Sequence, residues 1–199
     1  MTILRGFDII ISIVGLIILS PLFILLFLSI KFSSKDPVLY KQMRVGKNLK
    51  DFWLYKFRTM HTGADEKGLL TVGGRDNRIT GIGFYLRKYK LDELPQLINV
   101  LKGEMSIVGP RPEVRKYVNL YSEEQKRTLN VLPGITDYAS IIFRNENDLL
   151  AIVIDPEEYY INEIIPKKTS LNFRYINNQT PSEYFTIIAK TIISSIKGK

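Results

Sequence analysis

The 199-residue chain contains no cysteine and only one histidine, His61. Without cysteine there can be no disulfide framework, zinc ribbon or cysteine nucleophile; a reducing compartment is permitted but not required. A single histidine also excludes a multi-histidine metal site, and His61 lies in a glycine-bounded loop, where a surface role is commoner than a catalytic one. The length fits one domain with at most a short appendage, which argues against a multidomain machine.

Negative charge is scarcer than positive charge. Asp and Glu number 20 against 28 Lys and Arg, so the net charge at pH 7 is +8. Such an excess favours an anionic partner: nucleic acid, an acidic membrane surface or a phosphorylated substrate. Because no helix-turn-helix or aromatic RNA-binding motif is recognisable, nucleic acid is the weakest of the three.

Apolar residues concentrate near the N-terminus, where residues 9–30 carry no charge. As a helix this run would be about 30 Å long, enough for a membrane segment. It exceeds the ~7–15 apolar residues of a cleavable signal peptide and no small-x-small cleavage site follows it, so we expect the anchor to stay attached. Basic residues after the run outnumber Arg5 before it, and the positive-inside rule then places everything from Lys31 onward in the cytoplasm.

Ser20 and Pro21 lie in the middle of this run. Proline lacks a backbone donor and clashes with the carbonyl group four residues earlier, so we expect a break or a sharp bend. Ser20 could supply one local partner for the freed backbone groups. Two arrangements stay open, namely a kinked helix that crosses the bilayer and two half-helices that enter and leave on the same face. Arg5 and Asp8 favour the second, re-entrant form, because both could remain at the headgroup level.

The composition changes to that of an ordinary soluble protein after the run. We therefore expect a membrane-inserted anchor over residues 1–32 and a cytoplasmic domain over residues 33–199. Residues 51–60 mix aromatic and basic side chains and predict a strand or short extended segment. Residues 61–78 predict a loop and residues 132–136 a turn.

A final helix is predicted over Ser182–Ile196, with an apolar face and nearby lysines. It could lie on an anionic bilayer surface or pack against the protein core, and both remain open. The apolar face would comprise Phe185, Ile188, Ile192 and Ile196, and the lysines are Lys190, Lys197 and Lys199.

Residues 85–103 contain two adjacent carboxylates, Asp92 and Glu93, followed by apolar residues at helical spacing. Pro95 is tolerated in a first turn and Gly103 suits a helix end, so the two acids should lie at or just before a helix N-terminus. The helix dipole stabilises anions there, whether carboxylates or a docked phosphate. Farther on, Pro110 and Pro112 should hold Arg111 on a stiff extended turn.

Adjacent carboxylates allow three interpretations: a metal site, a nucleophile with a neighbouring base, or a helix cap beside an ordinary acid. By itself the pair favours the cap. The surrounding positive residues change the balance, because phosphoryl transfer depends on positioning and on neutralising negative charge, commonly with Mg²⁺ held by a carboxylate. A carboxylate can also attack phosphorus itself, a role open to Asp92 or Glu93. The positive residues are Lys56, Arg58, Arg75, Arg78, Arg87, Lys88 and Arg111.

Four segments carry a family resemblance: YKFRTM (55–60), RIT-x-IG-x-x-LRK (78–88), LDELPQLINVLKGEMSIVGPRPE (91–113) and LPGIT (132–136). Together they resemble the small bacterial membrane phosphoglycosyl transferases, the initiating sugar transferases of PglC type. The resemblance runs from the apolar N-terminus to about Thr136, and the motifs keep the family's order and spacing. The several extra transmembrane helices of larger relatives are missing, so we expect the minimal catalytic form.

The resemblance implies transfer of a sugar-1-phosphate from a UDP-sugar to undecaprenyl phosphate, with release of UMP and with Mg²⁺ as cofactor. It implies that Asp92 is the nucleophile and that Glu93 is its acidic partner. Whether Glu93 binds the metal or acts as a base stays open. Both acids are therefore candidate metal ligands. The candidate phosphate-binding or site-structuring residues are Lys56, Arg58, Arg87 and Arg111.

The resemblance also implies a place in the cell, because the acceptor is a lipid. The active site should lie at the cytoplasmic face of the bacterial inner membrane, and Ser20-Pro21 should break a re-entrant helix. We expect a ping-pong reaction in polysaccharide or glycoconjugate biosynthesis, with downstream glycosyltransferases as candidate partners. The expected fold is α+β and predominantly helical, with a membrane helix-break-helix, a compact catalytic domain with little sheet, and interfacial amphipathic helices.

The chain departs from the family pattern after LPGIT. Many members continue Gly-Trp-Ala-Gln, whereas this chain has Asp137-Tyr138-Ala139-Ser140, which leaves the identity of the sugar open. The alternative hypothesis is a non-catalytic membrane-anchored module that binds anionic glycolipid or partner enzymes. Its binding should weaken steeply with salt and should tolerate the loss of Asp92.

Overall fold

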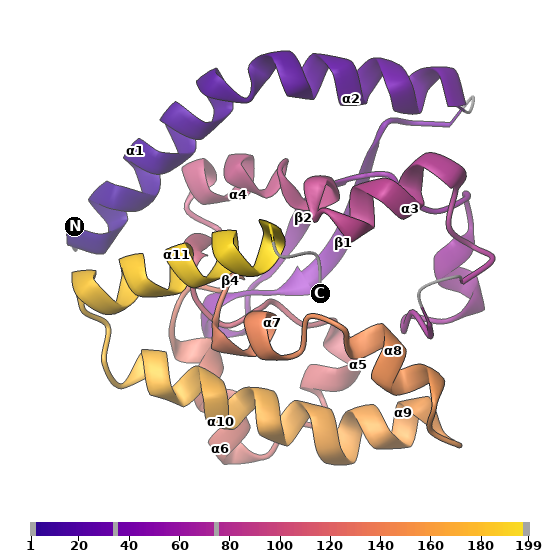
Figure 1. Cartoon of the computed structure of the whole chain (residues 1–199). Coiled ribbons are helices and arrows are strands. Elements are labelled where there is room, and N and C mark those ends of the chain that lie inside the picture. The colour runs from indigo at the N-terminus through magenta and orange to yellow at the C-terminus, as the bar shows by residue number, and fades with distance from the viewer. Residues whose placement is uncertain (1–2, 34–35, 74–75, 197–199) are drawn as a thin grey trace.

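The computed structural model describes residues 3–33, 36–73 and 76–196, and it is mostly helical with little sheet (Figure 1). The predicted predominantly helical α+β class is confirmed. The helices are α1 (Ile3–Ile18), α2 (Ser20–Ser33), α3 (Gly81–Lys88), α4 (Gln96–Lys102), α5 (Arg115–Val118), α6 (Glu123–Lys126), α7 (Tyr138–Ile142), α8 (Glu146–Ala151), α9 (Pro156–Tyr159), α10 (Ile165–Ile176) and α11 (Pro181–Ile196). The strands are β1 (Leu39–Val45), β2 (Asp51–Phe57), β3 (Ser106–Val108) and β4 (Gly134–Thr136).

Helices α1 and α2 form a bent arch along one face of the molecule (Figure 1). They meet at an angle of 62° at the predicted break. Pro21 has no N–H for the carbonyl oxygen of Ile17, and the Ser20 hydroxyl donates to that oxygen at 2.8 Å instead. No single helix in the described part of the chain has the length and apolar composition to cross a membrane, whereas α1 and α2 together have both. The break is confirmed, and the membrane arrangement stays a prediction.

Helix α1 is fastened to the rest of the protein through the buried carboxylate of Asp8, which is 2% exposed. One of its oxygens accepts hydrogen bonds from the Ser106 hydroxyl at 2.9 Å, the Ile107 backbone N–H at 2.8 Å and the Tyr184 hydroxyl at 3.0 Å. A buried carboxylate is tolerated when such bonds replace its water. Asp8 thereby joins α1 to β3 and α11, which lie far apart in the sequence.

Arg5 makes a second attachment one helical turn earlier. Its guanidinium donates to the carbonyl oxygen of Val100 at 2.7 Å and to that of Met105 at 3.2 Å. Val100 lies near the C-terminal end of α4, where the helix dipole favours a cation, and Met105 lies between α4 and β3. The first two turns of α1 therefore belong to the packed core, while the predicted division between residues 1–32 and 33–199 stays a prediction.

Two small sheets position the elements around the centre of the molecule. Strands β1 and β2 are antiparallel, whereas β3 and β4 are parallel. Asn99 of α4 holds β2 in place, because its side chain accepts from the Tyr55 backbone N–H at 3.0 Å and donates to the Trp53 carbonyl oxygen at 2.7 Å. The predicted strand within residues 51–60 is confirmed as far as Phe57. In the register Leu39 faces Phe57, Val45 faces Asp51, Ser106 faces Gly134 and Val108 faces Thr136.

The predicted turn over residues 132–136 was wrong in its second half, which forms strand β4. Its partner β3 lies more than twenty residues away, and a three-residue strand has too short a pattern to be recognised. Gly134 is required there, because a Cβ atom would lie 2.1 Å from the backbone nitrogen of Gly109. The two backbones approach closely only because both residues lack a side chain.

The last helix packs against the core, and only part of the predicted face takes part: Ile188 packs against the core cluster and the Phe185 ring contacts that of Phe7. Helix α11 buries Tyr184 and Ile187 completely, whereas Phe185 and Ile192 are 44% and 55% exposed. The buried positions are three residues apart and turn the apolar stripe toward β3, β4 and α1. Core packing is confirmed for this stripe, and contact of the exposed residues with a bilayer stays a prediction. Lys197 and Lys199 lie outside the described residues.

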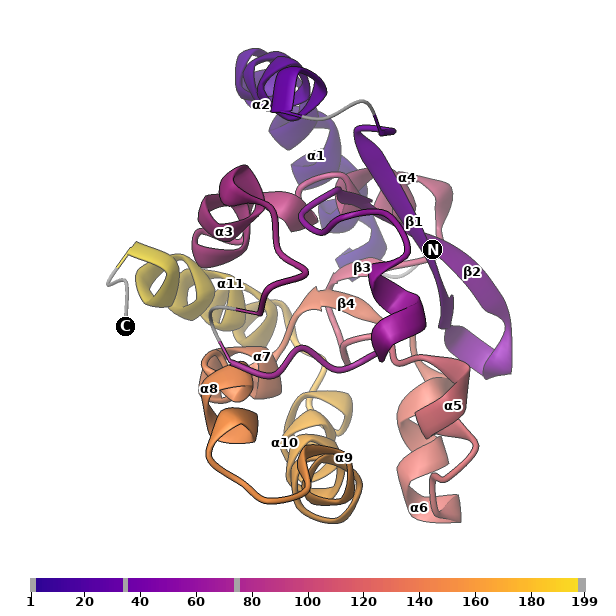
Figure 2. The ribbon, with the colours of Figure 1, turned by 90° about the vertical axis from the view of Figure 1, so that its right-hand side faces the viewer.

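Figure 2 views the centre of the molecule from the side, with α2 at one end and α6 and α9 at the other. A loop was predicted over residues 61–78. It follows β2, and its described part runs through the middle of this view. Its far end is held by the Gly73 backbone N–H, which donates to the Asn147 carbonyl oxygen of α8 at 2.8 Å. Arg78 binds the carbonyl oxygens of Ala64, Gly68 and Leu70 and thereby organises the loop from within.

Candidate active site

A cavity of about 1030 Å³ lies between the β1–β2 hairpin, the loop after β2, and helices α7, α8 and α10. Its lining includes Lys56, Arg58, Arg87, Asp92, Glu93 and Arg111. The structure therefore brings the six predicted site residues within residues 33–199 to one cavity, although they come from four separate segments. Ser20 and Pro21, the predicted membrane break, lie elsewhere in the arch.

Asp92 and Glu93 occupy a short 3₁₀ turn, Leu91–Glu93, directly before α4. The predicted place just ahead of a helix is confirmed, with Pro95 as the residue that precedes the helix. Both acids are buried, at 5% and 8% exposure. Successive residues in such a turn point about a third of a revolution apart, so the two carboxylates face different surroundings.

Glu93 faces two cations. Both terminal nitrogens of Arg111 donate to its carboxylate, one of them at 3.0 Å, and the Lys56 nitrogen lies 3.8 Å away. Burial would raise the pKa of Glu93, but the charges of Arg111 and Lys56 outweigh burial and hold the pKa below its ordinary value. Glu93 is therefore an ionised anchor for these two cations.

The same contacts change the two cations in opposite directions. The charge of Glu93 raises the pKa of Arg111 above its ordinary value, so the guanidinium stays protonated. Burial lowers the pKa of Lys56 to about 8, although Glu93 acts against this shift. Lys56 consequently titrates close to neutral pH.

Among the described residues, no cation makes such a contact with Asp92. Its Oδ1 atom is buried and makes no hydrogen bond within the part of the chain that the structure describes. Burial, and next the charge of Glu93, raise the pKa of Asp92 above its ordinary value. An unpaired buried carboxylate beside a paired one is a costly arrangement that is typical of functional sites.

Arg111 is held by its backbone as well as by Glu93. It lies on the extended segment after β3, between Pro110 and Pro112, as predicted. Its backbone N–H donates to Asp137 Oδ2 at 3.2 Å. Asp137 follows β4, so the parallel pairing of β3 and β4 sets these two residues side by side. Sequence reasoning gave Asp137 no role, because only this pairing reveals it.

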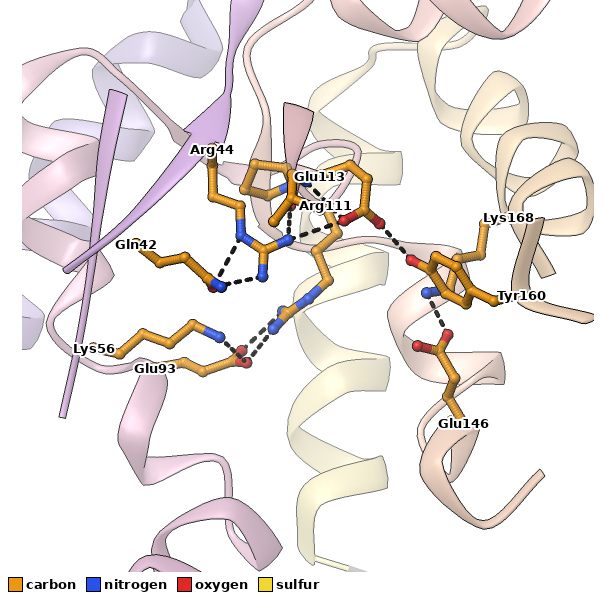
Figure 3. A network of polar contacts seen from close by, with 11 residues as sticks. Gln42, Arg44, Lys56, Glu93, Arg111, Glu113, Glu146, Tyr160 and Lys168 are labelled. Atoms are coloured by element: carbon orange, nitrogen blue, oxygen red, sulfur yellow. Dashed lines mark hydrogen bonds and ion pairs between the residues drawn. The ribbon is translucent and has the colours of Figure 1, made fainter. Parts of the chain in front are cut away.

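A second network lies beside the first (Figure 3). Arg44 Nη1 donates to Glu113 Oε1 at 3.1 Å, and the same guanidinium donates to Gln42 Oε1. The other oxygen of Glu113 accepts from the Tyr160 hydroxyl, and burial followed by the charge of Glu113 raises the pKa of Tyr160 well above its ordinary value. The network therefore ties β1 and the segment after β3 to the start of the C-terminal helices. The sequence did not predict this network, although Glu113 is the last residue of the 91–113 segment that carries the family resemblance.

The remaining predicted cations have different surroundings. Arg58 lies 3.4 Å from Asp36. Arg87 donates to the Thr71 hydroxyl at 3.0 Å, and its charge also favours the ionised form of Asp92. The other positive residues of the prediction do not contact the acidic pair directly: Arg78 binds Asp76 and the loop, Lys88 is exposed, and Arg75 lies outside the described residues. His61 is exposed, as its loop position predicted.

Comparison with known proteins adds the family. Residues 1–198 match the family described as bacterial sugar transferase. Over 162 residues the chain is 38% identical to the UDP-N-acetylgalactosamine-undecaprenyl-phosphate N-acetylgalactosaminephosphotransferase of Aeromonas hydrophila, which covers 79% of this chain and 38% of that protein. Over 154 residues it is 39% identical to the UDP-glucose:undecaprenyl-phosphate glucose-1-phosphate transferase of Escherichia coli, which covers 73% of this chain and 32% of that protein.

A relative of more similar length is the exopolysaccharide production protein ExoY of Rhizobium meliloti. It is 36% identical over 173 residues, which cover 79% of this chain and 76% of that protein. The chain thus spans about a third of the two larger relatives and three quarters of this one. The predicted resemblance is confirmed, and the chain belongs to the bacterial sugar transferase family.

Proposed function

We propose that this protein transfers a sugar-1-phosphate from a UDP-sugar to undecaprenyl phosphate and releases UMP. The names of its relatives support this general reaction. The observation that carries the proposal is the pair of adjacent buried carboxylates, of which Glu93 is neutralised by two cations and Asp92 is unpaired. A phosphoryl group needs cations that bind its oxygens and a nucleophile that is not already engaged.

In the proposed first step, a carboxylate oxygen of Asp92 attacks the β-phosphorus of the donor. The bond between that phosphorus and the bridging oxygen breaks, and UMP leaves with the electron pair. In the second step, a phosphate oxygen of undecaprenyl phosphate attacks the same phosphorus. The bond to Asp92 breaks, which restores the carboxylate and gives the lipid diphosphate sugar. The kinetics should therefore be ping-pong.

The cations would position the diphosphate and neutralise its charge. Arg111 has a side chain that is 34% exposed, so part of its guanidinium can reach a ligand while Glu93 holds the rest. Lys56 and Arg87 approach the acidic pair from β2 and α3. Groups fixed before the substrate arrives stabilise transition-state charge without further reorganisation.

Mg²⁺ is the cofactor that we propose for this site. Among the described residues no group of three or more acidic, histidine or cysteine side chains could hold a metal. Mg²⁺ is commonly held by one or two carboxylates, with substrate phosphates and water as the other ligands. Asp92, whose Oδ1 is buried without a partner among the described residues, fits that limited role, whereas both oxygens of Glu93 already accept from Arg111. When bound, the ion would neutralise charge on the diphosphate.

We further propose that α1 and α2 form a re-entrant segment on the cytoplasmic face of the bacterial inner membrane. Asp8 and Arg5 attach the start of α1 to the same body that carries the cavity, and α2 packs against α3. A helix that crossed the bilayer would carry Asp8 away from these partners. The arch also exposes large apolar side chains, among them Ile10, Ile17, Ile24, Leu25 and Phe32, and lipid contact would cover them.

The test is UMP release by the full chain in detergent or nanodiscs, with undecaprenyl phosphate, Mg²⁺ and a panel of UDP-sugars. UMP that forms only with the lipid, and that is lost with EDTA or in Asp92→Asn, supports the proposal. The exposed Glu124 provides the matched control Glu124→Gln, which should keep full activity. Substantial activity of Asp92→Asn would remove the nucleophile assignment.

The non-catalytic module makes the opposite prediction. It would release no UMP with any donor, and its binding to anionic lipid vesicles would fall steeply with salt but stay unchanged in Asp92→Asn. Intact-mass measurement after incubation with UDP-sugars, without the lipid, separates the two further. A phospho-sugar adduct that is absent from Asp92→Asn supports the enzyme.

A further inference from the structure

The cavity wall formed by α7 and α10 includes a group of uncharged polar side chains, next to the ion pair of Lys168 with Glu146. Ser140 of α7 and Ile165, Thr169 and Asn172 of α10 line this side. The three α10 residues are spaced by four and three positions, so they share one face of that helix. This side differs from the acidic pair and its cations because its polar groups are a hydroxyl, a second hydroxyl and an amide.

Two atoms on this side are buried without a partner. Asn172 is 9% exposed, and its Oδ1 accepts no hydrogen bond within the described part of the chain. The hydroxyl of Ser140 likewise has no partner among the described residues. A buried polar group without a hydrogen bond costs roughly 1–3 kcal/mol, so donors and acceptors from a ligand would stabilise this arrangement.

Asp137 connects this side to the acidic pair. One carboxylate oxygen accepts from the Arg111 backbone N–H at 3.2 Å, and the other accepts from the Ser140 backbone N–H at the start of α7. The guanidinium of the same Arg111 holds Glu93. Ser140 is therefore fixed by the residue that also fixes the cation beside the carboxylates.

We propose that Ser140 and Asn172 bind the sugar ring of the donor and determine which sugar is accepted. This inference rests on the proposed function and extends it to the residues that select the substrate. In a UDP-sugar the attacked phosphorus is bonded directly to the sugar, whereas the uracil base is separated from it by another phosphate and a ribose. Ser140, which Asp137 ties to Arg111, and Asn172 on the adjoining helix α10 thus offer neutral groups that suit the hydroxyl or acetamido groups of the sugar.

Hydrogen bonds of this kind are an efficient means of selection. A site built to pair with a substrate hydroxyl or amide rejects an analogue without that group, because its own buried groups then stay unpaired. The two residues come from a region in which the chain leaves its family's sequence pattern and from a helix beyond it. Different relatives act on N-acetylgalactosamine and glucose derivatives by name, and a selecting residue would be expected to differ where the sugar differs.

The test uses the full chain and the variants Ser140→Ala and Asn172→Ala. The exposed Ser170 and Asn162 give the matched controls Ser170→Ala and Asn162→Ala. The probes are UDP-glucose, UDP-N-acetylglucosamine, UDP-N-acetylgalactosamine and UMP, and each is measured by calorimetric binding and, for the three sugars, by kcat/KM.

Each variant should lower kcat/KM for the best donor about tenfold, the equivalent of one lost hydrogen bond of ~1.4 kcal/mol. The ratio between the best and the second donor should fall as well, while the affinity for UMP stays within about twofold of wild type. The two controls should change none of these values. A cooperative thermal unfolding transition shows that each variant is folded. If Asn172→Ala does not fold, Ser140→Ala alone still tests the inference.

Two results would overturn the inference. If UMP affinity falls by the same factor as donor affinity, the two residues contact the nucleotide. If donor preference is unchanged in both variants, they select nothing. Binding is measured separately from turnover, so a wild-type protein that binds UDP-sugars without transferring them overturns the proposed reaction and still tests the sugar contacts. A protein that binds no UDP-sugar overturns both.

Discussion

Removing one partner of the Arg111–Glu93 ion pair should lower the free energy of unfolding far more than removing both partners. Arg111→Met leaves the buried Glu93 with Lys56 at 3.8 Å as its remaining close cation. Breaking one side of a buried pair costs ~3–5 kcal/mol. Because Lys56 stays and the Arg111 side chain is 34% exposed, we expect a loss at or below the lower end of that range, about 2–3 kcal/mol.

The double variant Arg111→Met/Glu93→Gln removes both charges and should recover much of this loss. The wild type, the two single variants Arg111→Met and Glu93→Gln, and the double variant form a double-mutant cycle. We expect a coupling free energy of about 2 kcal/mol between the two residues. Arg115 and Asp51 supply the control cycle, because this pair is at 2.6 Å but both side chains are about 40% exposed. Exposed pairs contribute ~0–1 kcal/mol.

The single tryptophan, Trp53, provides a fluorescence signal for thermal unfolding in detergent. In a protein of this size 1 kcal/mol corresponds to about 2–4 °C in unfolding temperature. Arg111→Met should therefore unfold roughly 4–12 °C below the wild type. A coupling no larger than that of the exposed control pair would refute the view that Glu93 is a buried, ionised anchor.

Acid dependence provides an independent check on the same pair. The pKa of Glu93 is lower in the folded protein than in the unfolded chain, so its contribution to stability is present above the ordinary carboxylate pKa. That contribution is lost as the pH falls through the folded-state pKa. The double variant lacks Glu93 and should lose this part of the acid dependence.

Three further outcomes are expected. Asp92→Asn should raise the unfolding temperature at pH 7 while it abolishes UMP release, because the raised pKa of Asp92 means that its charge destabilises the folded state; a lower unfolding temperature would contradict this. Binding of a UDP-sugar should raise the pKa of Lys56 from about 8, so calorimetry in two buffers should detect proton uptake at pH 8 and little at pH 6. Asp8→Leu strands three hydrogen-bond donors and should cost ~3 kcal/mol or more in unfolding free energy, against a near-neutral Glu124→Gln.

Local sequence patterns predicted the features that depend on neighbours in the chain. Pro21 marks the break because it removes a donor from its own helix. Asp92 and Glu93 could be placed before α4 because Pro95 and the following apolar spacing indicate where that helix begins. The basic residues around them could be listed, but nothing in a local pattern says which of them reaches the carboxylates.

Features built from distant segments could not be predicted in this way. The pairing of β3 with β4 involves three residues on each side, and it alone brings Asp137 to Arg111. Tyr160 reaches Glu113 only because the C-terminal helices fold back onto the segment after β3. The buried stripe of α11 was only partly predicted, since Ile188 packs against the core but the fully buried Tyr184 and Ile187 were not in the predicted face. Apolar residues surround much of that helix, and only packing selects the face.

The division of labour between Asp92 and Glu93 follows from their unequal surroundings, although the sequence presents them as equals. The 3₁₀ turn directs the two side chains differently, and only Glu93 receives the forked contact of Arg111. Once Glu93 is ionised, its charge makes ionisation of Asp92 harder. A cation that enters with the diphosphate would reverse that penalty and leave an ionised, uncommitted carboxylate beside the phosphorus. In the proposed reaction, burial of the pair would link nucleophile activation to donor binding, because positive charge that arrives with the diphosphate would favour the ionised form of Asp92.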